Sequence, residues 1–327
     1  MPRSRSNPGT AALATLSLLV GACMGWGACS SSPQGHTAGA GGDDGGSGSG
    51  GSSGGSSGGS SGGSSGAGDG GPAACTATGA CKQPPSGAQV CITTVDVSLQ
   101  DPGGKAIVGL PVFVCGSNVC SSPAFTDATG AAHVAACLAF TSGSLKLVSD
   151  PQWEPFASLL TGAGPSFSVG HVTIHPLPAS GVALDGVAGG TFTSGGVSLT
   201  LAAGTTVKVD VEHTSADKSL FRAVEVPAKD LPEGLANTVD DAWALAPLDT
   251  TLSPPAALSL PNAPKYAAGA QVDVYLNGAD AEHTTPPVPW GTWGIIGTGT
   301  VSADGATIEL PASAGLAEIM MVGVKGH

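Results

Sequence analysis

The sequence predicts an all-β protein in which two tandem β-sandwich domains follow a signal peptide and a disordered Gly/Ser linker. Between residues 75 and 327, short runs of β-branched and apolar residues alternate with Gly, Pro, Asp and Asn turns, a pattern typical of β-sandwiches. No segment of this region keeps a sustained helical period. A length of about 250 residues is enough for two domains. We expect them to span residues 75–177 and 178–327, with the joint in the Pro-rich stretch 175–181.

The first 22 residues have the layout of an export signal. Arg3 and Arg5 form a positively charged start, an almost uncharged apolar stretch follows at residues 11–22, and small residues precede a cysteine. As a helix, the apolar stretch would rise about 18 Å, well short of the roughly 30 Å hydrocarbon core of a bilayer. Residues 1–22 are therefore expected to direct export rather than to span a membrane.

Residues 20–23, Val-Gly-Ala-Cys, resemble the bacterial lipobox. The resemblance implies cleavage before Cys23, diacylation of its thiol and acylation of the new N-terminus, which together meet the requirement for more than one chain in stable anchoring. Cys29 is the alternative: Trp26 stands where the motif has an aliphatic residue, yet three serines follow, as in many mature lipoproteins. We favour Cys23. Neither cysteine is followed by Asp, and by the same resemblance this implies that the lipoprotein is located at the outer membrane.

The lipidated N-terminus and a Gly/Ser-rich linker are expected to fill residues 23–74. This stretch has no hydrophobic period and cannot bury a core. As a flexible coil, residues 30–74 would span about 37 Å root-mean-square. A Gly-x-Ser-x-Gly match at residues 50–54 lacks the strand and helix that a hydrolase nucleophile requires on its two sides. The linker is therefore predicted to be a tether.

Six of the eight cysteines lie between residues 75 and 137. An even number in an exported chain predicts three disulfides, and the set comprises Cys75, Cys81, Cys91, Cys115, Cys120 and Cys137. Gly, Ser and Asn between Cys115 and Cys120 predict a hairpin that a bond between the two would close, worth about 2 kcal/mol. Cys75 with Cys81 and Cys91 with Cys137 follow only by elimination. Zinc is disfavoured because only one pair comes near the knuckle spacing.

The expected strands alternate apolar and polar residues, or form short apolar runs, between turn residues. In residues 205–213 the valines at 207, 209 and 211 fall on one face and the charged residues on the other. A short helical turn is expected within residues 228–245. The other clear strands are residues 90–100, 110–115, 143–149, 166–176, 196–204 and 270–278.

Residues 95–114 and 124–136 resemble carboxypeptidase regulatory-like, transthyretin-like modules. In those modules a strand leads through Asp-x-x-Gly turns into the next strands. The matching residues are Asp101, Gly109, Val112, Thr126, Asp127 and Gly130, and Asp and Gly are good turn formers. The resemblance implies that the first domain supports or binds and does not catalyse.

Residues 178–327 resemble the β-sandwich of zona-occludens proteins and netrin receptors, with Ala202 in place of a usual Pro and Leu252 in place of Phe. The residues that fit are Gly189, Gly190, Leu201, Gly204, Pro247, Pro255 and Leu258. The resemblance implies a role in protein contacts. Some similar domains cleave themselves after a histidine motif, which His213 and His283 match only loosely.

Composition excludes some partners. Eleven Lys and Arg residues against 24 Asp and Glu give a formal charge of −13, and the clustered basic residues that bind nucleic acid are absent.

No metal or cofactor is expected. His171 and His175 would lie about 13 Å apart on a strand and are expected to face solvent. Surface charge is the expected role of Asp240, Asp241 and Asp249, which lack an alternating calcium loop.

The sequence thus favours a non-catalytic cell-envelope lipoprotein that presents two β-sandwich modules for adhesion, structure or protein contact. Its partners would be the membrane, through the lipid, and envelope proteins or polysaccharide. One alternative is a carbohydrate-binding module in which Trp290 and Trp293 stack on a sugar, although packing in the core would equally explain them. A secreted hydrolase or autoprotease that uses His213 or His283 is the third hypothesis.

Overall fold

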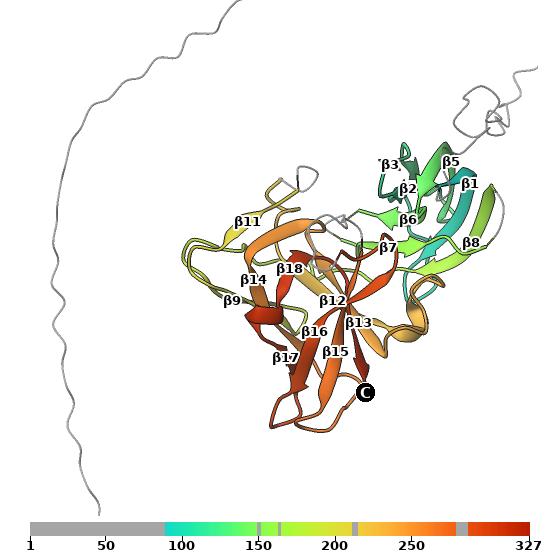
Figure 1. The fold of residues 1–327 in the computed structure, drawn as a ribbon. Helices are drawn as coiled ribbons and strands as arrows, with labels where there is room; N and C mark the ends of the chain where they lie inside the picture. The colour runs from blue at the N-terminus through green and yellow to red at the C-terminus, as the bar shows by residue number, and fades with distance from the viewer. Residues whose placement is uncertain (1–88, 149–151, 163–164, 211–214, 279–286) are drawn as a thin grey trace, which may run out of the picture. The chain divides into compact units, whose positions relative to one another are not determined.

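The computed structural model describes residues 89–148, 152–162, 165–210, 215–278 and 287–327 (Figure 1). These residues confirm the all-β prediction: strands joined by turns dominate, together with short 3₁₀ helices, η2 (Ala228–Asp230) and η3 (Ala312–Ala314). The predicted signal peptide and linker lie outside the described residues, as do Cys23, Cys29, Cys75, Cys81, His213 and His283.

None of the helices in the described ranges is long and apolar enough to cross a membrane.

The first half of the described chain forms two sheets around one hydrophobic cluster. Along β1 (Gln89–Gln100), alternate residues Val95, Val97 and Leu99 are buried, as expected for a strand with one face on a core. One sheet has the order β5 (Ala131–Thr141), β1 (Gln89–Gln100), β8 (Ser166–Thr173), with β1 antiparallel to β5 and parallel to β8. The other contains β3 (Val119–Cys120), β2 (Pro111–Gly116), β6 (Ser144–Leu147) and β7 (Phe156–Leu159), with β4 (Ala124–Phe125) also paired to β2.

The predicted hairpin at Cys115 and Cys120 is confirmed. The two residues face each other across β2 and β3 and form a disulfide with a Cα–Cα distance of 4.0 Å. Asn118 in the turn holds the hairpin against β5: its side-chain amide donates to the Ala139 carbonyl at 2.9 Å and its oxygen accepts from the Thr141 N–H at 2.8 Å.

Cys91 and Cys137 are also disulfide-bonded. The β1–β5 register places Cys91 opposite Ala139, so it lends no support to a bond between Cys91 and Cys137. That pairing stays a prediction, and the predicted partners Cys75 and Cys81 lie outside the described residues.

The second half forms an eleven-stranded sheet that nearly closes into a barrel. Its edge strands β9 (Gly190–Ser194) and β12 (Arg222–Pro227) approach each other at Gly195, where a Cβ atom would come within 2.0 Å of the Ala223 carbonyl oxygen. The strand order is β12 (Arg222–Pro227), β13 (Asp241–Ala246), β19 (Val322–Gly326), β15 (Gln271–Asn277), β16 (Trp293–Val301), β17 (Thr307–Leu310), β14 (Thr250–Pro261), β10 (Val197–Leu201), β9 (Gly190–Ser194), with β11 (Thr206–Lys208) and β18 (Leu316–Ile319) paired to β14.

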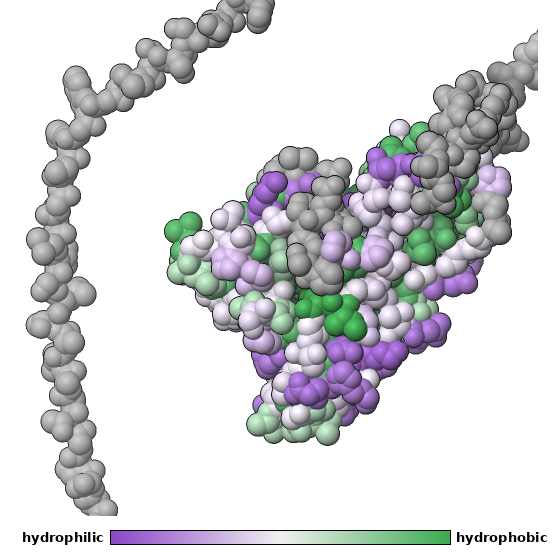
Figure 2. Space-filling view, in the orientation of Figure 1, coloured by the Kyte–Doolittle hydropathy of each residue, from purple (hydrophilic) through white to green (hydrophobic). Residues whose placement is uncertain are grey.

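Local predictions differ in detail from the structure. Of the strand expected at residues 205–213, the structure forms β11, which pairs with β14 over three residues, whereas residues 211–213 lie outside the described residues. The helical turn expected within residues 228–245 is η2. Figure 2 shows hydrophilic and hydrophobic residues interspersed over the visible face of the described chain.

Strand β13 joins the two halves, because it is buried on both faces. Trp243 and Leu245 point into the hydrophobic cluster of the eleven-stranded sheet, whereas Ala242 and Ala244 belong to the cluster of the first two sheets. Large residues therefore fill one core, and small ones let the other half approach closely. The described residues lie within one compact unit, and the predicted division at residues 177 and 178 stays a prediction.

Candidate functional site

The two tryptophans proposed as a sugar platform differ in burial, and each contacts another part of the chain. Trp290 is 9 % exposed, and the Lys146 ammonium lies 5.2 Å from the centre of its ring. Trp293 is half-buried, and its indole N–H donates to the Leu235 carbonyl at 2.9 Å. Between them, the Gly291 carbonyl accepts from the Leu159 N–H at 2.9 Å. This segment thus links the two halves of the described chain.

Asp249 also belongs to this contact rather than to an open surface. Its carboxylate accepts from Lys146 at 2.8 Å, and the two side chains are only 14 % and 10 % exposed. Asp241 is buried as well, and burial raises its pKa to about 6. The prediction of surface exposure is correct for Asp240. It is wrong for Asp241, because Asp241 belongs to β13, which has neighbours on both faces.

A buried polar cluster lies where the residues just before β7 and the segment just after β8 meet η2. Glu154 is 1 % exposed, and neither of its carboxyl oxygens has a hydrogen-bond partner among the described residues. His175 Nε2 lies 3.3 Å from the Asp230 carboxylate. His175 is therefore buried, contrary to expectation, whereas His171 is exposed. The Glu154 N–H donates to the His175 carbonyl at 3.1 Å, and the His175 side chain lies against Asp230 of η2.

Burial dominates the protonation of this cluster. It raises the pKa of Glu154 well above the ordinary value of 4.5, and the nearby Asp230 carboxylate raises it further. Burial lowers the pKa of His175, against the attraction of Asp230. Both changes favour neutral side chains, which is what an apolar environment requires of groups that lack full hydrogen bonding.

Glu154→Gln is expected to raise the free energy of unfolding at pH 7 by about 1–3 kcal/mol. The folded state binds a proton at Glu154 more tightly than the unfolded chain does. This contribution to stability is therefore complete below pH 4.5 and is lost as the pH rises through the folded-state pKa. The variant does not titrate there, so its advantage over the wild type should grow above pH 4.5, measured by urea unfolding at several pH values.

Glu233→Gln is the matched control, because Glu233 is exposed in the same part of the fold and its replacement should change stability by less than about 0.5 kcal/mol. An advantage of Glu154→Gln that is the same at every pH would contradict the assignment of a buried, titrating carboxyl.

A serine, a histidine and an aspartate lie in a row on the exposed face of the first sheet. Asp96 is paired with His133 on one side and Ser168 on the other, and His133 Nδ1 lies 2.5 Å from the Asp96 carboxylate. Ser168 and His133 are thus two strands apart, about 10 Å. A hydrolytic triad places the imidazole between the hydroxyl and the carboxylate, and here the carboxylate is in the middle.

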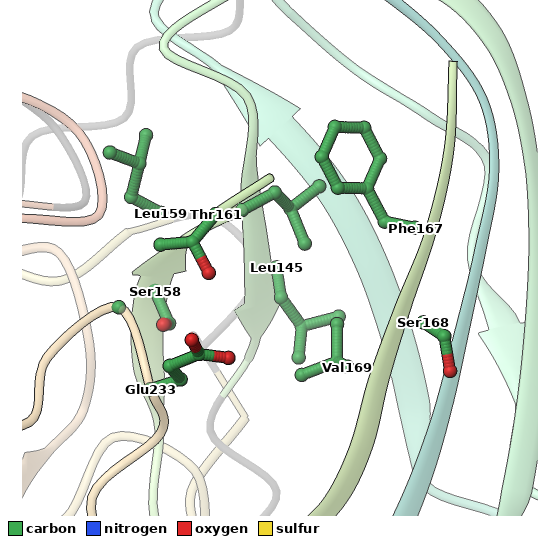
Figure 3. A pocket seen from close by; sticks show the side chains of 10 residues that line it. Leu145, Ser158, Leu159, Thr161, Phe167, Ser168, Val169 and Glu233 are labelled. Carbon is green, nitrogen blue, oxygen red and sulfur yellow. The ribbon is translucent and has the colours of Figure 1, made fainter. Parts of the chain in front are cut away.

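The cavity between β7, β8 and the loop around Glu233 is small (Figure 3). Ser158, Leu145 and Glu233 line it, and its volume is about 20 Å³. Such a space holds about one water molecule. It therefore offers no room for an organic ligand.

A larger cavity of about 510 Å³ lies beside the Trp153–Pro176 bridge; we call it the Trp153 cavity. Its volume falls in the range of about 300–1,000 Å³ that is usual for ligand pockets, and its mixed lining is also typical of them. The apolar residues of the lining are Trp153, Pro176, Leu177 and Ala179, and the polar ones are Gln152, Asp217 and Arg222.

Hydrogen bonds to backbone carbonyls hold the residues that line the Trp153 cavity. The Leu177 N–H donates to the Gln152 carbonyl at 2.8 Å, which fixes the strand-like segment that carries Trp153. Arg222 begins β12. Its Nη1 donates to the Asp217 carbonyl at 2.6 Å, and Gly181 leaves room for it, since a Cβ atom there would lie 3.2 Å from the guanidinium carbon.

The residues of this cavity were not singled out from the sequence. Arg222 carried one signal, because it is the sole arginine after Arg5. The sequence around Trp153 gave no such signal, because a single tryptophan between prolines is equally consistent with a residue of the hydrophobic core. Within the described ranges, no group of three His, Cys, Asp or Glu side chains is arranged to hold a metal ion.

No protein-family model matches this chain, and no curated protein shows significant similarity to it.

Proposed function

We propose that this protein is an exported, lipid-anchored and non-catalytic component of the bacterial cell envelope, held at the outer membrane through Cys23. One observation carries the proposal: Cys115 and Cys120 form a disulfide in the unit that follows the export signal. Cys91 and Cys137 are oxidised too. Disulfides persist in oxidising compartments such as the periplasm and the cell surface, which agrees with export.

The non-catalytic role is supported by what the polar groups do. The carboxylates of Asp101 and Asp127 accept backbone N–H groups in turns, and Asp249 binds Lys146. These side chains stabilise the fold of a module that presents a surface. Adhesion, envelope structure or contact with another envelope protein are the roles that follow for such a module.

Labelling of the expressing bacterium with radioactive palmitate tests the anchor. Wild type is expected to take up label, and Cys23→Ser to lose it, because the thiol that carries the diacyl group is absent. Cys29→Ser is the matched control and should be labelled like the wild type. Loss of label in Cys29→Ser alone would move the anchor by six positions, and an unlabelled wild type would contradict the lipoprotein proposal.

Carbohydrate binding is the second candidate function, and the Trp153 cavity is a better candidate site for it than the ring of Trp290. Trp153 is only half-buried and lines a cavity large enough for a sugar unit. Tryptophan offers a wide apolar face that suits a sugar ring. The ring of Trp290, by contrast, already contacts Lys146.

A further inference from the structure

We propose that the Trp153 cavity binds a sugar unit that carries a carboxylate, such as a uronate. In this complex Arg222 pairs with the carboxylate and Trp153 stacks on the ring. The inference rests on carbohydrate binding, the second function proposed above, and it names the class of sugar and the residue that selects it.

The buried guanidinium of Arg222 is the first argument. Arg222 is 4 % exposed, and arginine keeps its charge in proteins. No carboxylate in the described part of the chain forms an ion pair with it, although Lys146, the other strongly buried cation, is paired with Asp249. A buried charge is stable only when it is compensated, so the cavity beside Arg222 is where a counter-charge belongs.

The hydrogen-bond inventory of Arg222 leads to the same ligand. A guanidinium has five N–H donors. Asp217 accepts one of them through its carbonyl, while Nε is buried without a partner among the described residues. A planar carboxylate accepts two parallel N–H groups of a guanidinium, an arrangement that fixes orientation as well as affinity.

The rest of the lining distinguishes a sugar acid from a simple anion. Trp153, Pro176 and Leu177 are apolar residues of the lining; they would contribute nothing to the binding of phosphate or sulfate, whereas an apolar ring such as that of Trp153 suits the face of a pyranose. Asp217 lines the cavity and is exposed, so its carboxylate can accept hydrogen bonds from sugar hydroxyl groups. The exposed Asp217 carboxylate also disfavours a ligand with several negative charges on one small group.

Isothermal titration calorimetry of the full chain with digalacturonate and with its neutral counterpart digalactose tests the inference. Digalacturonate is expected to bind saturably and roughly tenfold more tightly than digalactose, because of the Arg222–carboxylate pair. Arg222→Met should remove this preference. Arg222→Lys, which keeps the positive charge but lacks the two parallel N–H groups of the guanidinium, should reduce it. Trp153→Ala should weaken binding of both sugars roughly tenfold.

Lys105→Met is the matched control: it removes a positive charge from an exposed turn and should leave both affinities unchanged. Trp153 is half-exposed, so Trp153→Ala keeps the test valid even where an Arg222 variant fails to fold. Equal affinity for the two sugars would overturn the carboxylate assignment and leave carbohydrate binding standing. Binding of inorganic phosphate as tight as that of digalacturonate, independent of Trp153, would overturn the inference in favour of a plain anion site. Binding of neither sugar would overturn carbohydrate binding as well and leave the palmitate-tested envelope role untouched.

Discussion

Trp243→Ala is expected to lower the free energy of unfolding by about 3–5 kcal/mol, the range for removal of a large buried aromatic side chain. Trp243 is fully buried in the core of the eleven-stranded sheet. Ala244, its neighbour in β13, faces the other core, and Ala244→Leu should cost about 1–3 kcal/mol through overpacking. Because one strand serves both cores, both variants should shift a single transition in urea unfolding.

Ala183→Leu is the control for Ala244→Leu, since Ala183 is exposed and the added bulk should change stability by less than about 0.5 kcal/mol. Two separate transitions, of which Trp243→Ala moves one and Ala244→Leu the other, would contradict the shared role of β13. That outcome would instead support two domains that unfold independently, with the boundary predicted at residues 177 and 178.

Asp249→Asn is expected to lower the free energy of unfolding by about 2–4 kcal/mol, because it leaves the Lys146 ammonium buried without its counter-charge. Asn preserves the size of the side chain and tolerates the left-handed backbone at this position, where φ is 58°. The double variant Lys146→Met/Asp249→Asn should regain most of the loss, since it removes both charges. Chemical denaturation of the three variants measures these differences.

Asp273→Asn is the matched control. It breaks the contact of Asp273 with His327, whose side chains are 22 % and 55 % exposed, and exposed pairs contribute at most about 1 kcal/mol. If Asp249→Asn were no more destabilising than this control, the Lys146 pair would not hold the two halves together.

The candidate sites show how far sequence reasoning reached. The hairpin at Cys115 and Cys120 was predictable because its residues are neighbours in the chain. The spacing of Trp290 and Trp293 in the sequence is compatible both with a sugar platform and with packing in the core, and it does not distinguish the two roles. The structure buries Trp290 and places the ammonium of Lys146, from a strand far away in sequence, 5.2 Å from the centre of its ring. The Trp153 cavity escaped prediction because it forms only where residues 152–179 approach residues 217–222.

By itself, the sequence determined the all-β class, the position of most strands, the turn residues and the close disulfide. These features follow from local chemistry: the period of two along a strand, the turn preferences of Asp and Gly, and the short reach between two nearby cysteines. The tertiary structure alone decided that β13 is buried on both faces, that His175 and Asp241 are enclosed, and that Arg222 lines a cavity without a partner carboxylate. The physical reason is that burial and charge compensation depend on which distant segments pack together, and no local pattern records that.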